Sequence, residues 1–467
     1  MTIDRNAFAR AGRRVALCVA LAVTPVAAAA ETLSDALTSA YEKSNLLEQN
    51  RAVLRAADED VARAVAALRP TLDFVASYSY ANTDGLGQPL NQDGLNDLSA
   101  TFALVAQVLI LDGGQRGLQT ELARETVLAT RESLLGVEQE VLLSAVRAYF
   151  DVLSARAFVD LGNNNLRLLR EEVQAARDRF EVGEVTRTDV ALAESRLAQS
   201  RSQLAAAEGN LAAASEAYRV AVGRYPGELV TPATTPQLPA TVEAATDIAR
   251  RQHPAIREAQ RQVTAADISV DIATRAYGPT VSATGRIQYD DEGRDRHTLG
   301  LEFRQPIYSG GRLPALERRA IAQRDQSRAS LHQTTLQVTE AVANAWSQIA
   351  VARAQIAATQ EQVRAAEIAF EGVREEARLG ARTTLDVLDA EQDLLDARAS
   401  RIDATAQQYE AIYSLLSAMG LLTVEHLQLG IPTYDPAAYY NAVSSAPARL
   451  SEQGGQLDRV LRRLGRQ

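Results

Sequence analysis

The sequence predicts a mostly helical protein with a small β part, built as two tandem copies of one unit. The sequence pattern around Gly380 repeats an earlier pattern around Gly183. Each glycine is followed six residues later by Asp-Val, and the two glycines lie 197 positions apart. In two runs, 114–183 and 311–380, the first and last glycines are 69 positions apart. Two further regions alternate polar and apolar residues, which is typical of strands. In a chain of 467 residues, this repeat favours two copies of one unit over unrelated domains.

The first 30 residues are expected to form a secretory signal peptide. Four arginines precede an apolar run over 15–23, and three alanines stand before Glu31. Removing this segment would also remove Cys18, the only cysteine, so we expect no disulfide and no thiolate site. The segment carries a net charge of +3 out of a total of −10, which leaves about −13 and disfavours nucleic acid as a partner. After Val23 no apolar run is long enough for a membrane helix, so strands would have to make any crossing.

The first repeat, 31–225, is predicted to begin with a helix that is weakest at Ser44 and to end with a helix that returns from a tip at Gly183. Its elements, in order, are a helix over 33–68, strands over 71–80 and 98–111 joined by a polar loop over 82–97, a long helix over 114–183, and a half-length helix ending at Gly223.

The second repeat, 240–430, follows a proline-rich linker over 226–239 and repeats this order. Its elements are a helix of about thirty-seven residues, strands over 280–289 and 299–307, a long helix over 311–380, and a half-length helix ending at Gly420. The remaining residues, 431–467, are expected to form an irregular tail with a basic helix at 457–464.

The long helices define the architecture. At about 1.5 Å per residue each would be a rod of about 100 Å, which an ordinary globular domain cannot hold. One long helix matches two half-length helices stacked end to end, and the outgoing helices from Val190 and Leu385 carry coiled-coil seams with 3/4 spacing. At the tips, Thr186-x-x-Asp189 and Thr383-x-x-Asp386 predict N-terminal helix caps.

Four strands with one apolar face cannot close a wall in lipid, so the chain would have to oligomerise to cross a membrane. Two chains would give eight strands and a filled interior, whereas three would give twelve strands and room for a lumen, which we favour. The polar face of the second hairpin, comprising Arg286, Gln288, Glu302 and Arg304, would then line the lumen.

Two tip motifs carry a family resemblance. They are Phe-x-Val-Gly-x-Val-x-x-Thr-Asp-Val at 180–190 and Gly-x-Arg-Thr-x-x-Asp-Val-Leu-Asp-Ala at 380–390. With them, residues 31–430 resemble the TolC-type outer-membrane efflux proteins of Gram-negative bacteria. The resemblance implies a homotrimer whose 12-stranded β-barrel in the outer membrane continues as a 12-helix α-barrel across the periplasm. It also implies docking to a periplasmic adaptor protein and to an inner-membrane pump of the ABC or RND type.

The resemblance also implies a gate at the periplasmic tips. Thr188 and Asp189 match the hydrogen-bonding pair of that gate, and Arg382 matches the arginine that bridges to them. Asp386 and Asp389 match an acidic ring at the constriction, which would favour cations in a trimer.

Other tip residues match the family's adaptor contacts. These are Val182, Gly183, Arg378, Leu379 and Gly380. The best-known gate has a tyrosine where this chain has Ala377, so one restraining link is expected to be missing.

Each assignment has a purely structural alternative. Asp189 and Asp386 could serve only as helix caps, and Asp389, with Asp393 and Asp396, could belong to a solvated acidic face. The turns would need the tip glycines in any case. The charged strand residues Arg286, Glu302 and Arg304 could simply be exposed to water.

No catalytic signature emerges. His253, His297, His332 and His426 lack the spacing of a metal or catalytic site, and the Gly-Gly pairs do not continue as phosphate-binding loops. We therefore expect no enzyme, cofactor or metal. The expected function is a passive exit duct for efflux or type I secretion, with the cargo and the pump class left open. A soluble periplasmic coiled-coil scaffold is the alternative, and it predicts extraction without detergent.

Overall fold

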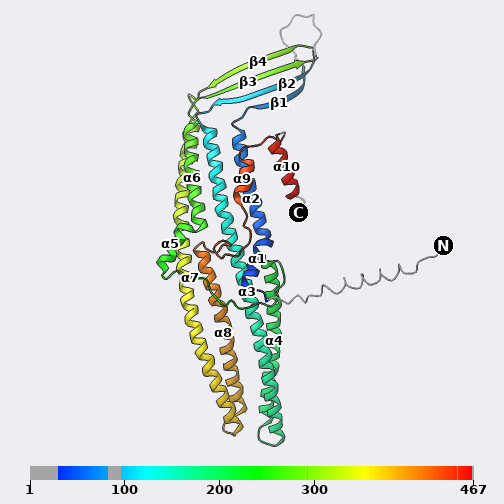
Figure 1. The fold of residues 1–467 in the computed structure, drawn as a ribbon, viewed down its shortest axis with the longest axis vertical. Helices are drawn as coiled ribbons and strands as arrows, with labels where there is room; N and C mark the ends of the chain where they lie inside the picture. Colours follow the sequence, from blue (N-terminus) through cyan, green and yellow to red (C-terminus); the bar gives the residue numbers. More distant parts are fainter. Residues whose placement is uncertain (1–29, 83–95, 292, 450, 465–467) are drawn as a thin grey trace, which may run out of the picture. The chain divides into compact units, whose positions relative to one another are not determined.

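The computed structural model describes residues 30–82, 96–291, 293–449 and 451–464 (Figure 1). The predicted signal peptide up to residue 29 and most of the loop over 82–97 lie outside the described residues. The described residues are mostly helical with one four-stranded sheet, which confirms the predicted fold class. Among the described residues, no helix combines the length and the apolar character needed to cross a membrane.

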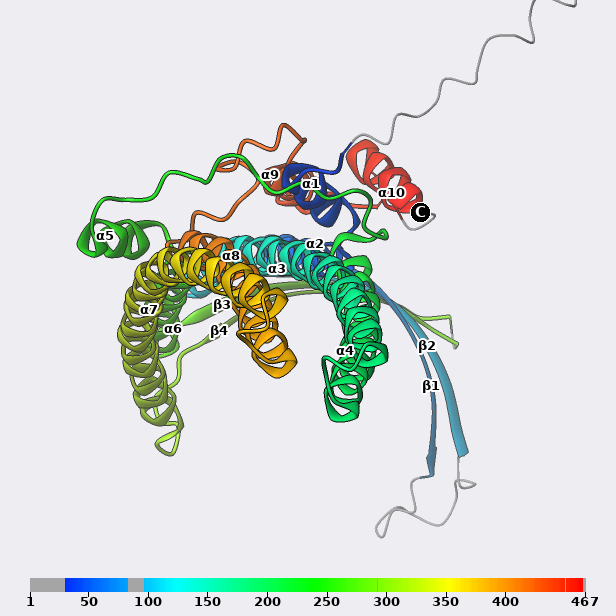
Figure 2. The same cartoon turned by 90° about the horizontal axis from the view of Figure 1, so that it is seen from below.

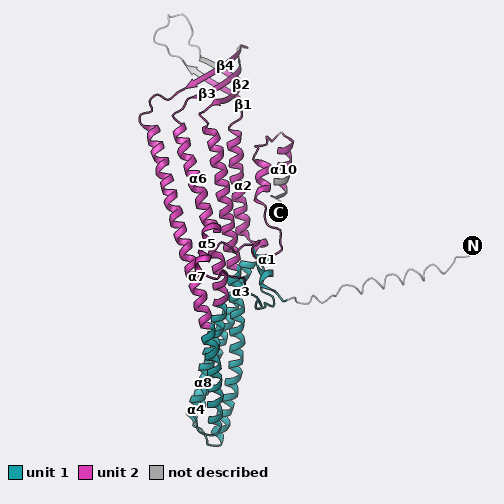
Figure 3. Ribbon diagram, turned by 60° about the vertical axis from the view of Figure 1, so that its left-hand side comes forward, with its two compact units in different colours: residues 1–40, 145–235, 356–406 teal, residues 41–144, 236–355, 407–467 magenta. Residues whose placement is uncertain are grey.

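The chain forms two compact units, and each contains parts of both repeats (Figure 3). Unit 1 comprises residues up to 40 together with 145–235 and 356–406. Unit 2 comprises 41–144, 236–355 and 407–467. The repeats remain an interpretation of the sequence.

The helices have the bounds that the glycine spacing predicted. The two long helices, α3 (Gln115–Glu181) and α7 (Arg312–Arg378), have 67 residues each, about 100 Å at about 1.5 Å per residue. The helices that leave the tips, α4 (Arg187–Val222) and α8 (Thr384–Ala418), have 36 and 35 residues. Figures 1 and 2 show α4 running back alongside α3, and α8 alongside α7.

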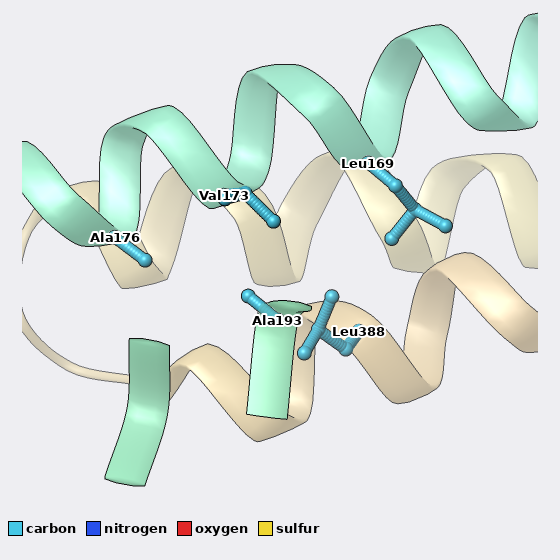
Figure 4. Packing of buried hydrophobic residues seen from close by; sticks show 5 residues of the cluster. All are labelled: Leu169, Val173, Ala176, Ala193 and Leu388. Carbon is cyan, nitrogen blue, oxygen red and sulfur yellow. The ribbon is translucent and has the colours of Figure 1, made fainter. Parts of the chain in front are cut away.

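Unit 1 is held together by apolar side chains between these helices. Leu169, Val173 and Ala176 on α3 face Ala193 of α4 and Leu388 of α8 (Figure 4). All five are at least nine-tenths buried, so this cluster joins the two tip hairpins to each other. A second cluster packs α7 against α8, and it contains Phe370, Ala377, Val387 and Leu394.

The helices that enter the hairpins are each broken once. In the first copy, α1 (Leu33–Lys43) ends before Ser44, whose side chain caps α2 (Asn45–Ala66) by accepting from the Leu47 N–H at 3.2 Å. This confirms the predicted weakness. In the second copy, α5 (Val242–Gln252) and α6 (Pro254–Arg275) are separated at His253, a break that the prediction of one helix missed. Pro254 at the first position of α6 was the available signal.

The sheet in unit 2 consists of two antiparallel hairpins in the order β1-β2-β3-β4. The strands are β1 (Thr71–Asn82), β2 (Asn96–Leu111), β3 (Thr280–Asp290) and β4 (Asp295–Arg304). Phe74 pairs with Leu104, and Leu104 with Ile287, so the apolar residues share one face. The prediction extended the last strand too far, because Ile307 lies beyond the end of β4.

The tail is more ordered than predicted. A short helix, α9 (Pro436–Val443), lies in a segment that was expected to be irregular, and α10 (Glu452–Leu464) begins earlier than the predicted basic helix. Tyr434, just before α9, stacks on Arg51 at 5.3 Å and donates its backbone N–H to Tyr41 at 3.2 Å. Aromatic and hydrogen-bond contacts therefore dock the tail onto unit 2.

Candidate functional site

Both tips are built on a glycine in the left-handed region. Gly183 has φ 82° and Gly380 has φ 77°, values that a residue with a Cβ rarely adopts. The N–H groups of Glu184 and Ala381, one residue past each glycine, donate to carbonyl oxygens five residues back, both at 2.9 Å. This pattern ends the incoming helix with a tight left-handed cap. An added Cβ would meet nothing within 4 Å, so the turns need these glycines for their backbone angle.

The predicted adaptor-contact residues lie at the outer surface of these turns. Val182 is 71% exposed and Leu379 is 79% exposed. Arg378 is exposed too, and it pairs with Glu375 at 3.5 Å. The structure thus brings apolar, accessible side chains to both tips, as a docking surface requires.

The predicted helix caps are confirmed. The Asp189 carboxylate accepts from the Thr186 N–H at 2.8 Å and from the Thr186 hydroxyl at 2.7 Å, and its own N–H donates back at 3.3 Å. Asp386 and Thr383 form the same box with distances of 2.9, 2.9 and 3.2 Å. These bonds hold the pKa of both carboxyl groups below the usual range. Thr188 lies exposed in the first turn of α4.

Arg382 has its nearest acceptor on its own hairpin. Its Nε lies 2.8 Å from Glu376 Oε2, and both side chains are about half exposed. The link from Arg382 to Thr188 and Asp189 therefore stays a prediction. Glu376 would compete with Thr188 and Asp189 for Arg382.

Asp389 has a partner that sequence reasoning missed. The Arg196 guanidinium of α4 donates to Asp389 Oδ1 of α8 at 3.1 Å, which joins the outgoing helices of the two hairpins. Arg196 stands 197 positions before Asp393, so the two outgoing helices carry opposite charges at equivalent positions. That opposition does not identify the pair, because Arg196 binds Asp389, one turn before Asp393.

Three more ion pairs tie the helices of unit 1 together. Each joins two different helices, and their sequence separation hides them from a local reading. They are Arg177–Glu194 between α3 and α4, Arg374–Glu172 between α7 and α3 at 3.4 Å, and Arg398–Glu367 between α8 and α7 at 2.8 Å.

The predicted lumen residues share one face of the sheet in unit 2. Glu302 pairs with Ser282 and Arg304 with Thr280, which places them on the same face as Arg286 and Gln288 and opposite the apolar residues. Arg304 donates to Glu302 at 2.9 Å. The face is therefore charged and hydrogen-bonded. Among the described residues, no three His, Cys, Asp or Glu side chains gather to form a metal site.

Comparison with known proteins gives consistent matches. The model of the family described as "Outer membrane efflux protein" matches residues 36–224 and 245–421. The chain is 35% identical to the outer membrane efflux protein BepC of Brucella suis, over 90% of this chain and 92% of BepC. It is 25% identical to the proteases secretion protein PrtF of Dickeya chrysanthemi, over 82% and 86%. The CmeC outer membrane channel of Campylobacter jejuni has the same fold, with a TM-score of 0.75, 18% identity and coverage of 89% and 90%.

Proposed function

The chain belongs to the outer membrane efflux protein family, and from this premise we propose that it is the outer-membrane channel of a tripartite efflux or type I secretion system. It would sit in the outer membrane and extend into the periplasm. BepC is named for efflux and PrtF for the secretion of proteases, and both names describe export. The role that we propose for this chain is the exit duct for such export. The proposal assigns no catalytic role to the chain.

The sheet is the observation that carries this proposal. Its apolar face is uncovered: Phe74 is 70% exposed, Leu299 93% and Phe303 66%. Such a face is unfavourable in water, and β1 and β4 are the outer strands of the described sheet. Three copies would join these edges into twelve strands, bury the apolar faces in lipid, and turn Arg286 and Glu302 inward.

We place the gate at the tips of unit 1. Thr188, Asp189, Arg382, Asp386 and Asp389 are the proposed gate residues, and the exposed tips are the proposed adaptor contacts. The caps occupy one oxygen each of Asp189 and Asp386, and Arg196 occupies one oxygen of Asp389. Each carboxylate keeps a second oxygen that could face the bore. Opening would untwist the half-length helices against the long ones when the adaptor and the inner-membrane pump engage.

Fractionation and bilayer recording test the channel role. The protein should appear in the outer membrane, require detergent for extraction, and form conducting pores in planar bilayers. Extraction in water as a monomer would instead support the soluble periplasmic scaffold.

The adaptor contact is tested separately by photo-crosslinking from Leu379. A crosslinker at Val220 is a matched control, because Val220 is 77% exposed and lies on α4 away from the tip. We expect Leu379 to capture the periplasmic adaptor and Val220 not to. Equal capture from both positions would contradict docking at the tips.

A further inference from the structure

Glu391 is a buried carboxyl group without a hydrogen bond. It lies on α8, is 5% exposed, and neither of its carboxyl oxygens has a hydrogen-bond partner. A charged group in such a place is unfavourable unless an opposite charge lies beside it. The position therefore calls for either a proton or a cation.

Charged groups from each neighbouring helix face this site. The charges of Glu172 on α3 and Arg374 on α7 both interact electrostatically with Glu391, and these two residues form an ion pair with each other at 3.4 Å. Arg196 of α4 lines the same small cavity as Glu391, but it is paired with Asp389 of α8. Both nearby arginines thus already bind another carboxylate.

The first repeat shows what the missing interaction would be. Arg177 stands 197 positions before Arg374, and Glu194 stands 197 positions before Glu391. In the first hairpin these two residues bind each other, with the Arg177 Nε donating to Glu194 at 3.2 Å. In the second hairpin the equivalent arginine has turned to Glu172 instead, and the equivalent glutamate is left alone.

We propose that Arg374 exchanges between Glu172 and Glu391, and that a proton on Glu391 decides which of the two it binds. With the proton present, Glu391 is neutral and Arg374 stays on Glu172, which ties α7 to α3. When the proton leaves, the buried carboxylate attracts Arg374 into the pairing seen in the first hairpin. The tie between α7 and α3 is then released.

The titration of Glu391 supports this exchange. Burial first, and then the charge of Glu172, raise the pKa of Glu391 to about 7, against the opposing effect of Arg374. Both forms are therefore populated near neutral pH. Because the tips of these helices are the proposed gate, this inference rests on the proposed function, and it makes the gate looser as the pH rises.

Spin labels test the exchange without relying on conduction. One label at Glu184→Cys and one at Ala381→Cys place a probe on each exposed tip, and the only cysteine, Cys18, lies in the predicted signal peptide. Between about pH 5.5 and about pH 8.5 the ratio of ionised to protonated Glu391 rises roughly a thousandfold. We expect the distance distribution of the full-length protein in detergent to move to longer values across this range.

Two variants identify the group responsible. Glu391→Gln fixes the neutral form and should keep the acid distribution at both pH values. Glu194→Gln, the matched control from the first hairpin, should leave the pH response in place. A response that survives in Glu391→Gln, or that is lost equally in Glu194→Gln, would overturn the proposal.

Infrared difference spectra between the two pH values give a second readout. Between the two pH values the band of protonated carboxylic acids should weaken in the unsubstituted protein, and the part of this change that titrates near pH 7 should be missing in Glu391→Gln. If no such band titrates, the exchange is wrong, even if the channel conducts. Conversely, absent conductance with pH-dependent distances would contradict the channel and leave the exchange standing.

Discussion

Arg196 on α4 and Asp389 on α8 form an ion pair of 3.1 Å between the two tip hairpins. The family resemblance predicts that Asp389 belongs to an acidic ring at a constriction, and the structure gives this carboxylate a cation from the other repeat. Arg196 is 31% exposed and Asp389 56%, so solvent weakens the pair. Its position, one turn beyond the cap of Asp386, nevertheless makes it a restraint on how far the hairpins separate.

Removing this restraint should favour the open state. For Arg196→Ala we expect a higher mean conductance in planar bilayers at low salt. Losing the ion pair should destabilise the closed state by about 0.5 kcal/mol, which shifts the open-to-closed ratio about twofold per chain. The difference should shrink in high salt, because salt screens exposed pairs. Arg167→Ala is the control, since Arg167 pairs with Glu171 within α3 alone. Equal conductance in Arg196→Ala and Arg167→Ala would remove the pair from the gate.

The cap at Thr186 should control the order of the first turn of α4. Thr186→Ala removes the hydroxyl that accepts from the Asp189 N–H, which should lower the stability of the helix start by about 1 kcal/mol. Hydrogen exchange of the amides in that turn should accelerate about fivefold, as that energy implies. Thr188→Ala, two residues later, leaves the cap intact and should exchange at the original rate. If both variants exchange equally fast, the box does not hold the tip.

Much of the fold follows from short-range patterns. Gly183 and Gly380 marked the tips, because their left-handed backbone is a local requirement. Period-two alternation located four strands, and the spacing from Thr186 to Asp189 identified the cap. These features depend on neighbouring residues alone, so a single sequence contains them.

What the sequence could not predict depends on contacts between distant residues. Arg374 could bind a glutamate on either of two helices, and only packing decides that it binds Glu172. The partner of Asp389 is 193 residues away. The helix α9 is short, and its order comes from contacts such as that between Tyr439 and Glu59 at 2.7 Å. Local propensity is a weak guide in such segments.

Glu31 should be a large contributor to the stability of unit 1. Its buried carboxylate accepts from the Tyr218 hydroxyl at 2.5 Å, from Arg224 at 2.8 Å and from the Gly227 N–H at 2.9 Å. Glu31→Ala would leave these donors without their acceptor, which should lower the free energy of unfolding by about 3 kcal/mol. Thermal unfolding followed by circular dichroism should show a lower midpoint. Glu42→Ala, on the exposed side of α1, is the control, and a midpoint equal to that control would show that Glu31 is dispensable.

Asp58 provides a pH-dependent test in unit 2. It is fully buried on α2, between Leu54 and Val61 of an apolar cluster, and neither carboxyl oxygen has a hydrogen-bond partner. Arg131 is nearby, but it stacks on Tyr440 at 5.2 Å and donates to a backbone carbonyl at 3.2 Å. Burial, with a smaller effect of Glu59, therefore raises the pKa of Asp58 to about 6.

A raised pKa means that the folded state binds the proton of Asp58 more tightly than the unfolded state does. The resulting stability is fully present below about pH 3.8, the usual value, and is lost as the pH rises through about 6. Asp58→Asn removes this loss, so at pH 8 it should be more stable than the unsubstituted protein by on the order of 3 kcal/mol. The gain should shrink as the pH falls from 7 to 4, in thermal unfolding measured at each pH. Asp60→Asn, at a 60% exposed side chain on the same helix, should show no such trend. A gain for Asp58→Asn that stays constant across this range would mean that Asp58 does not titrate in the folded protein.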